Sequence, residues 1–163
     1  MLNVISAYAQ VGYTEEEKRN FWSEMDGVMQ ELEENERVIV GADLNGHVGI
    51  GNDVIERVHG GHGIGERNSE GESIVDFALS FDMAIVNTFF TKKREHLVTY
   101  RSGGRYSQID YFLYKRLGLV EVKNCKVIPG DHVAPQHRLL CMDLKLKRER
   151  KTKVRGMRKI KWY

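Results

Sequence analysis

The sequence predicts an α/β fold whose sheet is at least partly antiparallel. Apolar residues recur at helical spacing over residues 15–34, and short apolar runs typical of buried strands occupy residues 38–40 and 84–86. Late in the chain, a Ser-Gly-Gly segment at residues 102–104 separates two strand-like segments and indicates a hairpin. Helices that alternate with strands, followed by hairpins, favour the α/β class.

Length and composition indicate a single soluble globular domain. The chain has 163 residues, of which 41% are hydrophobic and 29% are charged. Two cysteines, Cys125 and Cys141, are too few for a disulfide framework or a zinc site, so we expect reduced thiols in the core. The sequence contains neither a signal peptide nor an apolar run of membrane-spanning length. We therefore expect a nuclear or intracellular protein that does not bind membranes.

The net charge of +2 hides an uneven distribution. From Lys145 to the end there are ten Lys or Arg residues and one acid, whereas the rest of the chain carries 15 basic and 22 acidic residues. Such a tail is typical of a solvated, disordered linker, and it also attracts nucleic acid; the two interpretations are compatible. We expect residues 1–146 to form the folded domain and residues 147–163 to form a disordered basic tail.

In the first half of the chain, a strand, a helix and a long loop are predicted around a central strand. Residues 2–7 resemble a strand, and Thr14, followed by three glutamates, is a typical N-cap for the helix over residues 15–34. Residues 38–40 form a buried strand that ends at Gly41. The glycine-rich segment over residues 46–71 is predicted to be a long surface loop.

The second half predicts one helix and a series of strands. Ser69 and Glu72 fit a capping box at the start of the second helix. The strands are expected, in order, at residues 83–87 (extended by 88–93), 98–101, 108–113, 120–128 and 139–146. The hairpin is expected to join the strands at 98–101 and 108–113.

Polar residues that suit phosphate chemistry follow the central strand. Asp43 and Asn45 lie two residues apart, so an extended backbone places both side chains on one face. A carboxylate next to a carboxamide suits a divalent metal and a phosphate oxygen. The alternative is an Asx turn that closes the strand, because Asp and Asn favour such turns.

An acid and a histidine later in the chain extend this pattern. Asp110 lies within an apolar strand, where a carboxylate is costly without a partner. His137 precedes the last strand, and an acid beside it would orient the imidazole and favour its charged form. Asp131 and His132 are a second candidate pair, but their position between Pro129 and Pro135 favours a plain turn.

Seven segments together resemble the endonuclease/exonuclease/phosphatase superfamily, whose fold is that of DNase I. The resemblance is greatest to the endonuclease domains of RTE-type non-LTR retrotransposons. The segments occur in the order of that family at residues 3–9, 41–49, 65–71, 86–90, 97–104, 108–111 and 136–140. The resemblance implies an α/β chain that forms the C-terminal half of the four-layer sandwich of this superfamily, without the N-terminal portion and its metal-binding glutamate.

The resemblance also implies roles for individual residues. The implied catalytic residues are Tyr8 (contact with the scissile phosphate), Asp43 (orientation or deprotonation of water), Asn45 (phosphate binding), Asp110 (support of the histidine) and His137 (stabilisation of phosphate charge). The implied substrate-binding residues are Arg67, Asn68, Thr99 and Ser107. Mg²⁺ is the implied cofactor, with Asp43 and Asn45 forming a partial metal site in which Gln136 replaces the usual aspartate.

The implied function is Mg²⁺-dependent hydrolysis of a DNA phosphodiester by an endonuclease domain fragment. DNA is the expected partner, and the basic tail is expected to bind nucleic acid as well. The absent glutamate favours an alternative, in which the chain is a catalytically inactive nuclear protein that binds nucleic acid or protein. Half of a two-sheet sandwich leaves an apolar sheet face and an edge strand uncovered, so we also expect self-association.

Overall fold

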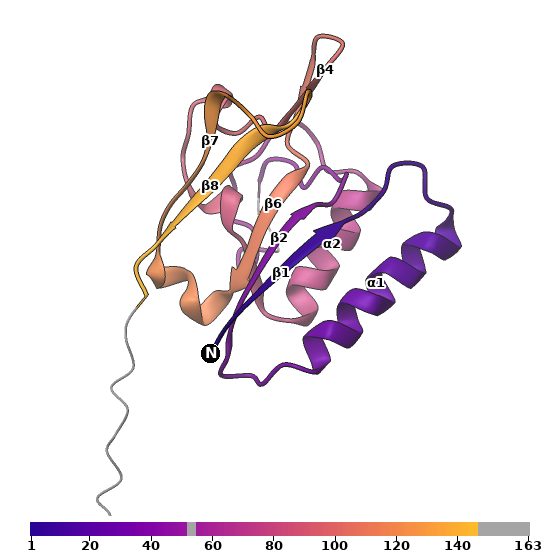
Figure 1. The fold of residues 1–163 in the computed structure, drawn as a ribbon, viewed down its shortest axis with the longest axis vertical. Coiled ribbons are helices and arrows are strands. Elements are labelled where there is room, and N and C mark those ends of the chain that lie inside the picture. The colour runs from indigo at the N-terminus through magenta and orange to yellow at the C-terminus, as the bar shows by residue number, and fades with distance from the viewer. Residues whose placement is uncertain (52–54, 147–163) are drawn as a thin grey trace, which may run out of the picture.

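The computed structural model describes residues 1–51 and 55–146, so the predicted tail at 147–163 lies outside the described residues. A four-stranded sheet carries two helices on one face and a long β-hairpin on the other (Figure 1). The helices and strands are α1 (Glu15–Gln30), α2 (Ser69–Ser80), β1 (Leu2–Tyr8), β2 (Arg37–Asp43), β3 (Met83–Ile85), β4 (Tyr100–Ser102), β5 (Arg105–Ser107), β6 (Asp110–Lys115), β7 (Val122–His132) and β8 (Arg138–Leu144). Three 3₁₀ turns complete the described elements: η1 (Val86–Phe89), η2 (Arg94–His96) and η3 (Arg116–Glu121).

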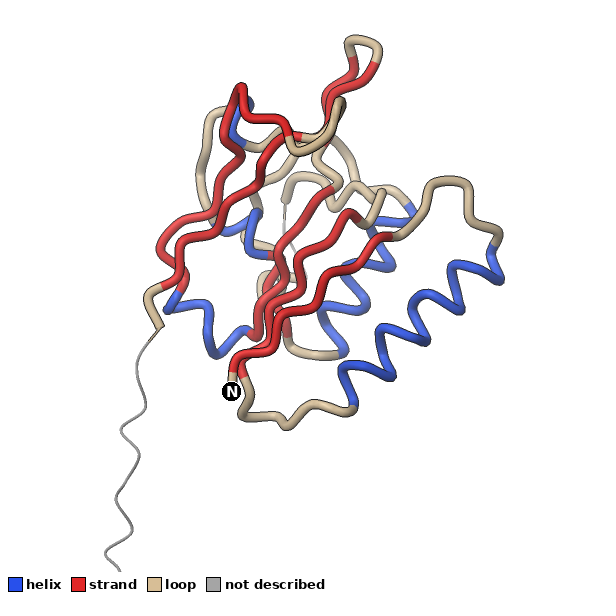
Figure 2. Tube along the Cα trace, in the orientation of Figure 1, coloured by secondary structure: helices blue, strands red, loops and turns tan. Residues whose placement is uncertain are grey.

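The central sheet has the strand order β1-β2-β6-β3. β1 and β2 are parallel because α1 connects them, whereas β6 is antiparallel to both β2 and β3. The strand pairs β4–β5 and β7–β8 form two separate two-stranded sheets (Figure 2). This mixture confirms the α/β class with a partly antiparallel sheet.

β2 has a core on each of its two faces, because successive side chains of a strand point to opposite sides. Val38 and Val40 are fully buried and belong to the larger core, which α1 and α2 cover. Ile39 lies on the opposite face and packs in the smaller core beneath the β7–β8 hairpin, together with Tyr114. Gly41 does not end the strand as predicted. A side chain at this position would contact the Phe112 ring at 3.1 Å, so glycine lets the ring lie across the strand.

Of the two predicted helix N-caps, one is confirmed and the other is wrong. Thr14 caps α1 in a full capping box with Glu17. The predicted box at α2 does not form. Asn68 is the N-cap instead, and its Oδ1 accepts a hydrogen bond from the Gly71 backbone N–H at 2.9 Å. α1 also ends at Gln30, before the predicted boundary at residue 34.

The later strands differ from the prediction in their pairing. β3 ends at Ile85 because Asn87 joins β6 through its side chain: its Nδ2 donates to the Asp110 carbonyl and its Oδ1 accepts from the Phe112 N–H. β4 pairs with the short strand β5, and β6 enters the central sheet instead. The glycine-rich segment is not wholly a surface loop, since Val58 and His59 within it are fully buried.

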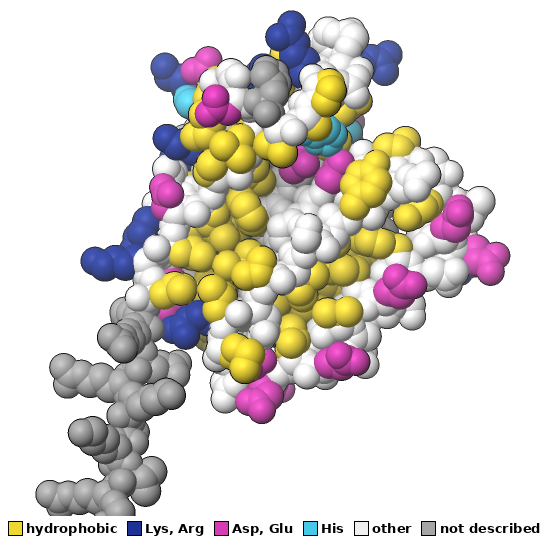
Figure 3. Space-filling model, viewed as in Figure 1, with side chains coloured by type: hydrophobic (Ala, Val, Ile, Leu, Met, Phe, Trp, Pro, Cys, Tyr) yellow, Lys and Arg dark blue, Asp and Glu magenta, His cyan; other side chains and the backbone are white. Residues whose placement is uncertain are grey.

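β1 leaves one edge of the central sheet open among the described residues. Its outward-facing side chains include Leu2, Val4 and Tyr8, which are 39%, 70% and 58% exposed. Figure 3 shows hydrophobic side chains gathered over this face of the molecule. The uncovered apolar face that the resemblance implies is therefore present, and self-association through it stays a prediction. Within the described part of the chain, no helix is long and apolar enough to cross a membrane.

Candidate active site

Three predicted site residues form a row across one end of the central sheet. Tyr8 is the register partner of Asp43 in the parallel β1–β2 pair, and Asp43 is the partner of Asp110 in the antiparallel β2–β6 pair. Register partners share a face of the sheet, so the row lies on the side of the β7–β8 hairpin. The sheet thus brings together two carboxylates from positions 67 residues apart in the sequence.

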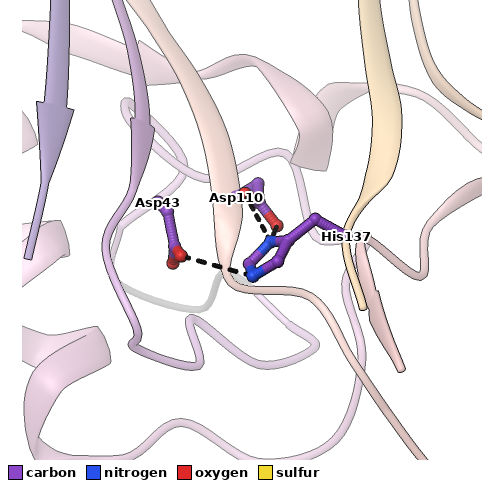
Figure 4. Close-up of side chains that lie close together, drawn as sticks. All are labelled: Asp43, Asp110 and His137. Carbon is purple, nitrogen blue, oxygen red and sulfur yellow. Dashed lines mark hydrogen bonds and ion pairs between the residues drawn. The ribbon is translucent and has the colours of Figure 1, made fainter. Parts of the chain in front are cut away.

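His137 completes this group from the segment just before β8 (Figure 4). Its Nδ1 lies 3.2 Å from Asp110 Oδ2, within hydrogen-bond distance. Its Nε2 lies 3.8 Å from Asp43 Oδ2, which is an ion-pair distance when the ring is protonated. The ring therefore stands between the two acids, and one ligand atom of each residue lies within 4.8 Å of those of the other two.

Burial and mutual repulsion make the two carboxylates hard to ionise. Burial, followed by the charge of Asp110, raises the pKa of Asp43 to about 6, although the Asn45 backbone N–H and His137 partly oppose this shift. Burial also raises the pKa of Asp110, against the lowering effects of Thr99 and His137. A group poised near neutrality is suited to accept a proton from water.

Thr99 supports Asp43 and Asp110, the acid row, from inside the molecule. Its side chain is fully buried, and its Oγ1 accepts hydrogen bonds from the backbone N–H groups of Ile109 and Asp110 at 3.0 and 3.1 Å. Its carbonyl accepts a bond from the Arg138 N–H at 2.8 Å. Thr99 therefore joins the start of β6 to the start of β8, and it acts on the site through these strands.

Asn45 lies in an Asx turn, which is one of the two interpretations that the sequence leaves open. Asp43 Oδ1 accepts a bond from the Asn45 backbone N–H, which forms the Asx turn. The Asn45 backbone is left-handed, with φ of 46°, so it does not continue the extended strand. Its Nδ2 donates to the Ala9 carbonyl at 2.7 Å and thereby holds the segment after β1 against the end of β2.

Gln136 is held away from the acids by its neighbours. Its Oε1 accepts a bond from the Tyr100 hydroxyl at 3.1 Å, and its Nε2 donates to Ser102 Oγ at 2.8 Å. The Tyr100 ring also meets the His137 ring edge-on, with centroids 4.9 Å apart. Sequence reasoning missed the role of Tyr100, because no local pattern shows that β4 lies beside residue 137.

The predicted substrate-binding residues have internal partners as well. Arg67 Nε donates to the Val48 carbonyl at 3.1 Å, and Asn68 Oδ1 accepts from the His47 N–H as well as capping α2. The Ser107 carbonyl accepts a bond from the Thr99 N–H at 3.0 Å. These contacts shape the loops around the acid row, and direct contact of these residues with substrate stays a prediction.

A cavity of about 430 Å³ opens over the acid row. Its lining includes Asp43, Asp110, His137 and the apolar residues Val133 and Leu140. Two buried carboxylates that repel each other are a donor set that a divalent cation would stabilise, and oxygen ligands are those that Mg²⁺ prefers. The residues present therefore fit the implied metal, although Gln136 and the Asn45 amide nitrogen face other partners.

Comparison with known proteins places the fold of the chain among endonuclease-like folds. No protein-family profile matches the chain. Over 149 residues it is 30% identical to craniofacial development protein 2 of Bos taurus and 29% identical to that of Tragulus javanicus. The matched region is 90% of this chain but 25% and 26% of those proteins, so the chain spans about a quarter of the length of the curated relatives it matches.

The solved endonuclease domain of TRAS1, a telomere-specific non-LTR retrotransposon, has a similar structure. The TM-score is 0.58 at 13% sequence identity, and the match covers 86% of this chain and 56% of that one. The chain therefore has a DNase I-like α/β fold, and over 90% of its length it is similar in sequence to craniofacial development protein 2.

Proposed function

We propose that this chain hydrolyses DNA phosphodiester bonds with a divalent metal ion. The observation that carries this proposal is the group formed by Asp43, Asp110 and His137 at the floor of a cavity, in a fold shared with an endonuclease domain. Two acids beside one histidine supply both a proton acceptor and a positive charge, which phosphodiester hydrolysis requires.

Asp43 and Asp110 are the residues that would hold Mg²⁺, which supplies positive charge to a phosphate oxygen and lowers the pKa of bound water. Asp43 accepts the proton of the attacking water through Oδ2, the oxygen that lies on the side of His137 and the cavity. The Asx turn keeps its Oδ1 fixed by the Asn45 N–H, so the other oxygen faces the cavity side.

His137 supplies charge from the opposite side of the cavity. Asp110 accepts a hydrogen bond from Nδ1–H, which fixes the ring orientation and leaves Nε2 directed toward Asp43 and the cavity. In its protonated form, Nε2–H donates to a phosphate oxygen and stabilises the negative charge that develops there. The proposal assigns contact with the same phosphate to Tyr8, which is 58% exposed at the end of the row.

Nicking of supercoiled plasmid in Mg²⁺ tests this proposal. The purified chain is expected to convert supercoiled DNA to the relaxed form, and neither Asp43→Ala nor His137→Ala is expected to do so. Circular dichroism establishes that each protein is folded. Absence of nicking by the folded wild type would overturn the proposal, and equal nicking by the variants would assign the activity to a contaminant.

A second candidate function is binding of nucleic acid or protein without hydrolysis. It is supported by the internal contacts of the Asn45 amide and Gln136, which leave two carboxylates in the acid group. It is also supported by the similarity to craniofacial development protein 2. Under this alternative, the folded wild type binds DNA or a protein partner and produces no nicked plasmid at any divalent metal concentration.

A further inference from the structure

A second cavity lies at the start of β8. Its volume is about 460 Å³, and it is lined by Lys93, Arg94, Glu95, Val98, Tyr106 and Arg138. Arg138 lines both cavities and directly follows His137 in the chain. The two cavities are therefore neighbours that meet at one residue.

The cations of this second cavity lack carboxylate partners. Some cations elsewhere in the described chain meet acids, as Lys18 meets Glu70 and Arg57 meets Asp82. None of Lys93, Arg94 and Arg138 forms an ion pair within the described residues, and the one acid in the lining, Glu95, lies beside His96. Moreover, Arg138 Nε is buried and has no hydrogen-bond partner in that part of the chain.

A buried guanidinium nitrogen without a partner is costly unless a ligand supplies one. Three cations around one cavity select an anion, and the guanidinium geometry suits the oxygens of a phosphate. Figure 3 shows further Lys and Arg side chains around the β4 end of the molecule. Three cations without an acid partner among the described residues therefore line one cavity beside the candidate active site.

An aromatic ring adds a second kind of contact. Tyr106 is 40% exposed and lines the same cavity, and the Arg101 guanidinium lies 5.1 Å from its ring centroid. Arginine stacked on an aromatic ring, next to phosphate-binding cations, is a combination that holds an unpaired base. A phosphorylated peptide would use the cations but would have no base for the ring, so the observations favour nucleic acid.

We propose that the cavity formed by Lys93, Arg94, Val98, Tyr106 and Arg138 binds one unpaired nucleotide of the nucleic-acid substrate, with its phosphate on the cations and its base on Tyr106. This site lies outside the scissile position and rests on the proposed function, because it assigns a second contact to the same substrate. A strand bound at the acid row reaches it across Arg138.

Binding of single-stranded DNA in EDTA tests the site without any catalytic step. Fluorescence anisotropy with a labelled oligonucleotide measures the affinity, and Arg94→Ala and Tyr106→Leu are the test variants. Arg19→Ala removes an exposed cation from α1 and serves as the matched control. Every protein carries the same basic tail, so differences between variants report the cavity.

Arg94→Ala is expected to lower the slope of log K against log salt by about 0.7, the value for one lost phosphate contact on a single strand. Tyr106→Leu is expected to weaken binding about tenfold, as loss of one stacked base does. With an oligonucleotide that carries abasic positions, Tyr106→Leu should match the wild type, while Arg94→Ala should still differ.

Wild-type binding that neither variant changes would overturn the site, even if plasmid nicking is observed. The same holds if Arg19→Ala weakens binding as much as Arg94→Ala does, because the charge effect would then be general. Conversely, variant-dependent binding by a protein that nicks no plasmid would support the site and overturn the hydrolase proposal. The two proposals therefore fail independently.

Discussion

The two ends of β2 and β6 carry two buried ionic groups on the same face of the same pair of strands. At one end, Arg37 binds Glu121 through two hydrogen bonds of 2.9 Å, and the Tyr114 hydroxyl donates to Glu121 at 2.8 Å. At the other end, Asp43 and Asp110 face His137. Glu121 immediately precedes β7 and His137 immediately precedes β8, so the hairpin supplies one member to each group.

The difference between the groups lies in charge balance. Glu121 is matched by a guanidinium, and burial raises the pKa of Tyr114 to about 12, which keeps its hydroxyl a donor at neutral pH. The site end places two acids against one imidazole, and burial, followed by the charge of Asp110, raises the pKa of Asp43 to about 6. Burial alone therefore does not mark a functional site. A buried charge that no opposite charge of the protein balances is a better mark of a functional site.

The largest expected effect separates activity from stability at the site end. Asp43→Asn should lower the nicking rate by about 10²- to 10⁴-fold, because the proton acceptor is lost. The same change should raise the free energy of unfolding at pH 7.5, since it removes a buried charge beside Asp110. Plasmid nicking and urea denaturation measure the two quantities. A destabilised variant would show that the site end is balanced after all.

At the Arg37–Glu121 end, a substitution is expected to lower stability and to leave activity unchanged. Arg37→Met should lower the free energy of unfolding by about 3 kcal/mol, because it leaves the Glu121 carboxylate buried without its guanidinium. The activity per folded molecule should stay unchanged. Urea denaturation measures the cost, and the double variant Arg37→Met/Glu121→Leu is the control. If the double variant is as unstable as the single one, the cost comes from packing and not from charge.

The next expected effect is the pH dependence that Asp43 gives to the nicking rate and to the free energy of unfolding. The nicking rate should fall about tenfold per pH unit below about pH 6, where Asp43 becomes protonated. The free energy of unfolding is expected to change in the opposite direction, rising as the pH falls. The folded pKa lies above the ordinary 3.8, so the folded state binds more protons and becomes more stable relative to the unfolded state as pH falls from 6 to 4. Urea denaturation across this range should show a gain of roughly 2 kcal/mol from Asp43 in the wild type. Asp43→Asn should show a smaller gain, which comes from Asp110, whose pKa burial also raises.

The smallest expected effect concerns the support of the acid row. Thr99→Val keeps the side-chain shape but removes the acceptor for two backbone N–H groups, at a cost of about 1–2 kcal/mol in unfolding free energy. It should also shift the pH at which nicking is half-maximal, because Thr99 lowers the pKa of Asp110 and the charge of Asp110 in turn raises the pKa of Asp43. Thr99→Ser retains the hydroxyl and should leave that midpoint in place. Equal midpoints in both variants would limit Thr99 to a packing role.

The sequence predicts the strands that carry the acids better than it predicts their neighbours. The apolar run at residues 38–40 located β2, and the resemblance pointed to Asp43, Asp110 and His137, which the structure brings together. The pairing of β4 with β5 could not be predicted in the same way, because both strands have only three residues and little alternation. Long-range contacts decide such short segments.

The contacts of the site side chains show the same limit. The Asx turn at Asp43 follows from local chemistry and was one of the two interpretations open from the sequence. The partners of Gln136 lie 34 and 36 residues away on β4, so no local signal reveals them. The Asn68 cap was missed because Ser69 offered an equally good local pattern, and only the bond to Gly71 selects between them.

The Phe112 ring that lies over Gly41 stands between the two ionic groups. Arg37 and Asp43 are six residue steps apart along β2, a span of about 20 Å, and sites more than about 10 Å apart that share no partner usually have independent effects on stability. Substitutions at one end are therefore felt little at the other. A single change at Asp43 would therefore remove hydrolysis and leave a fold that is equally or more stable. Descendants of such a variant would keep this fold and could acquire another function.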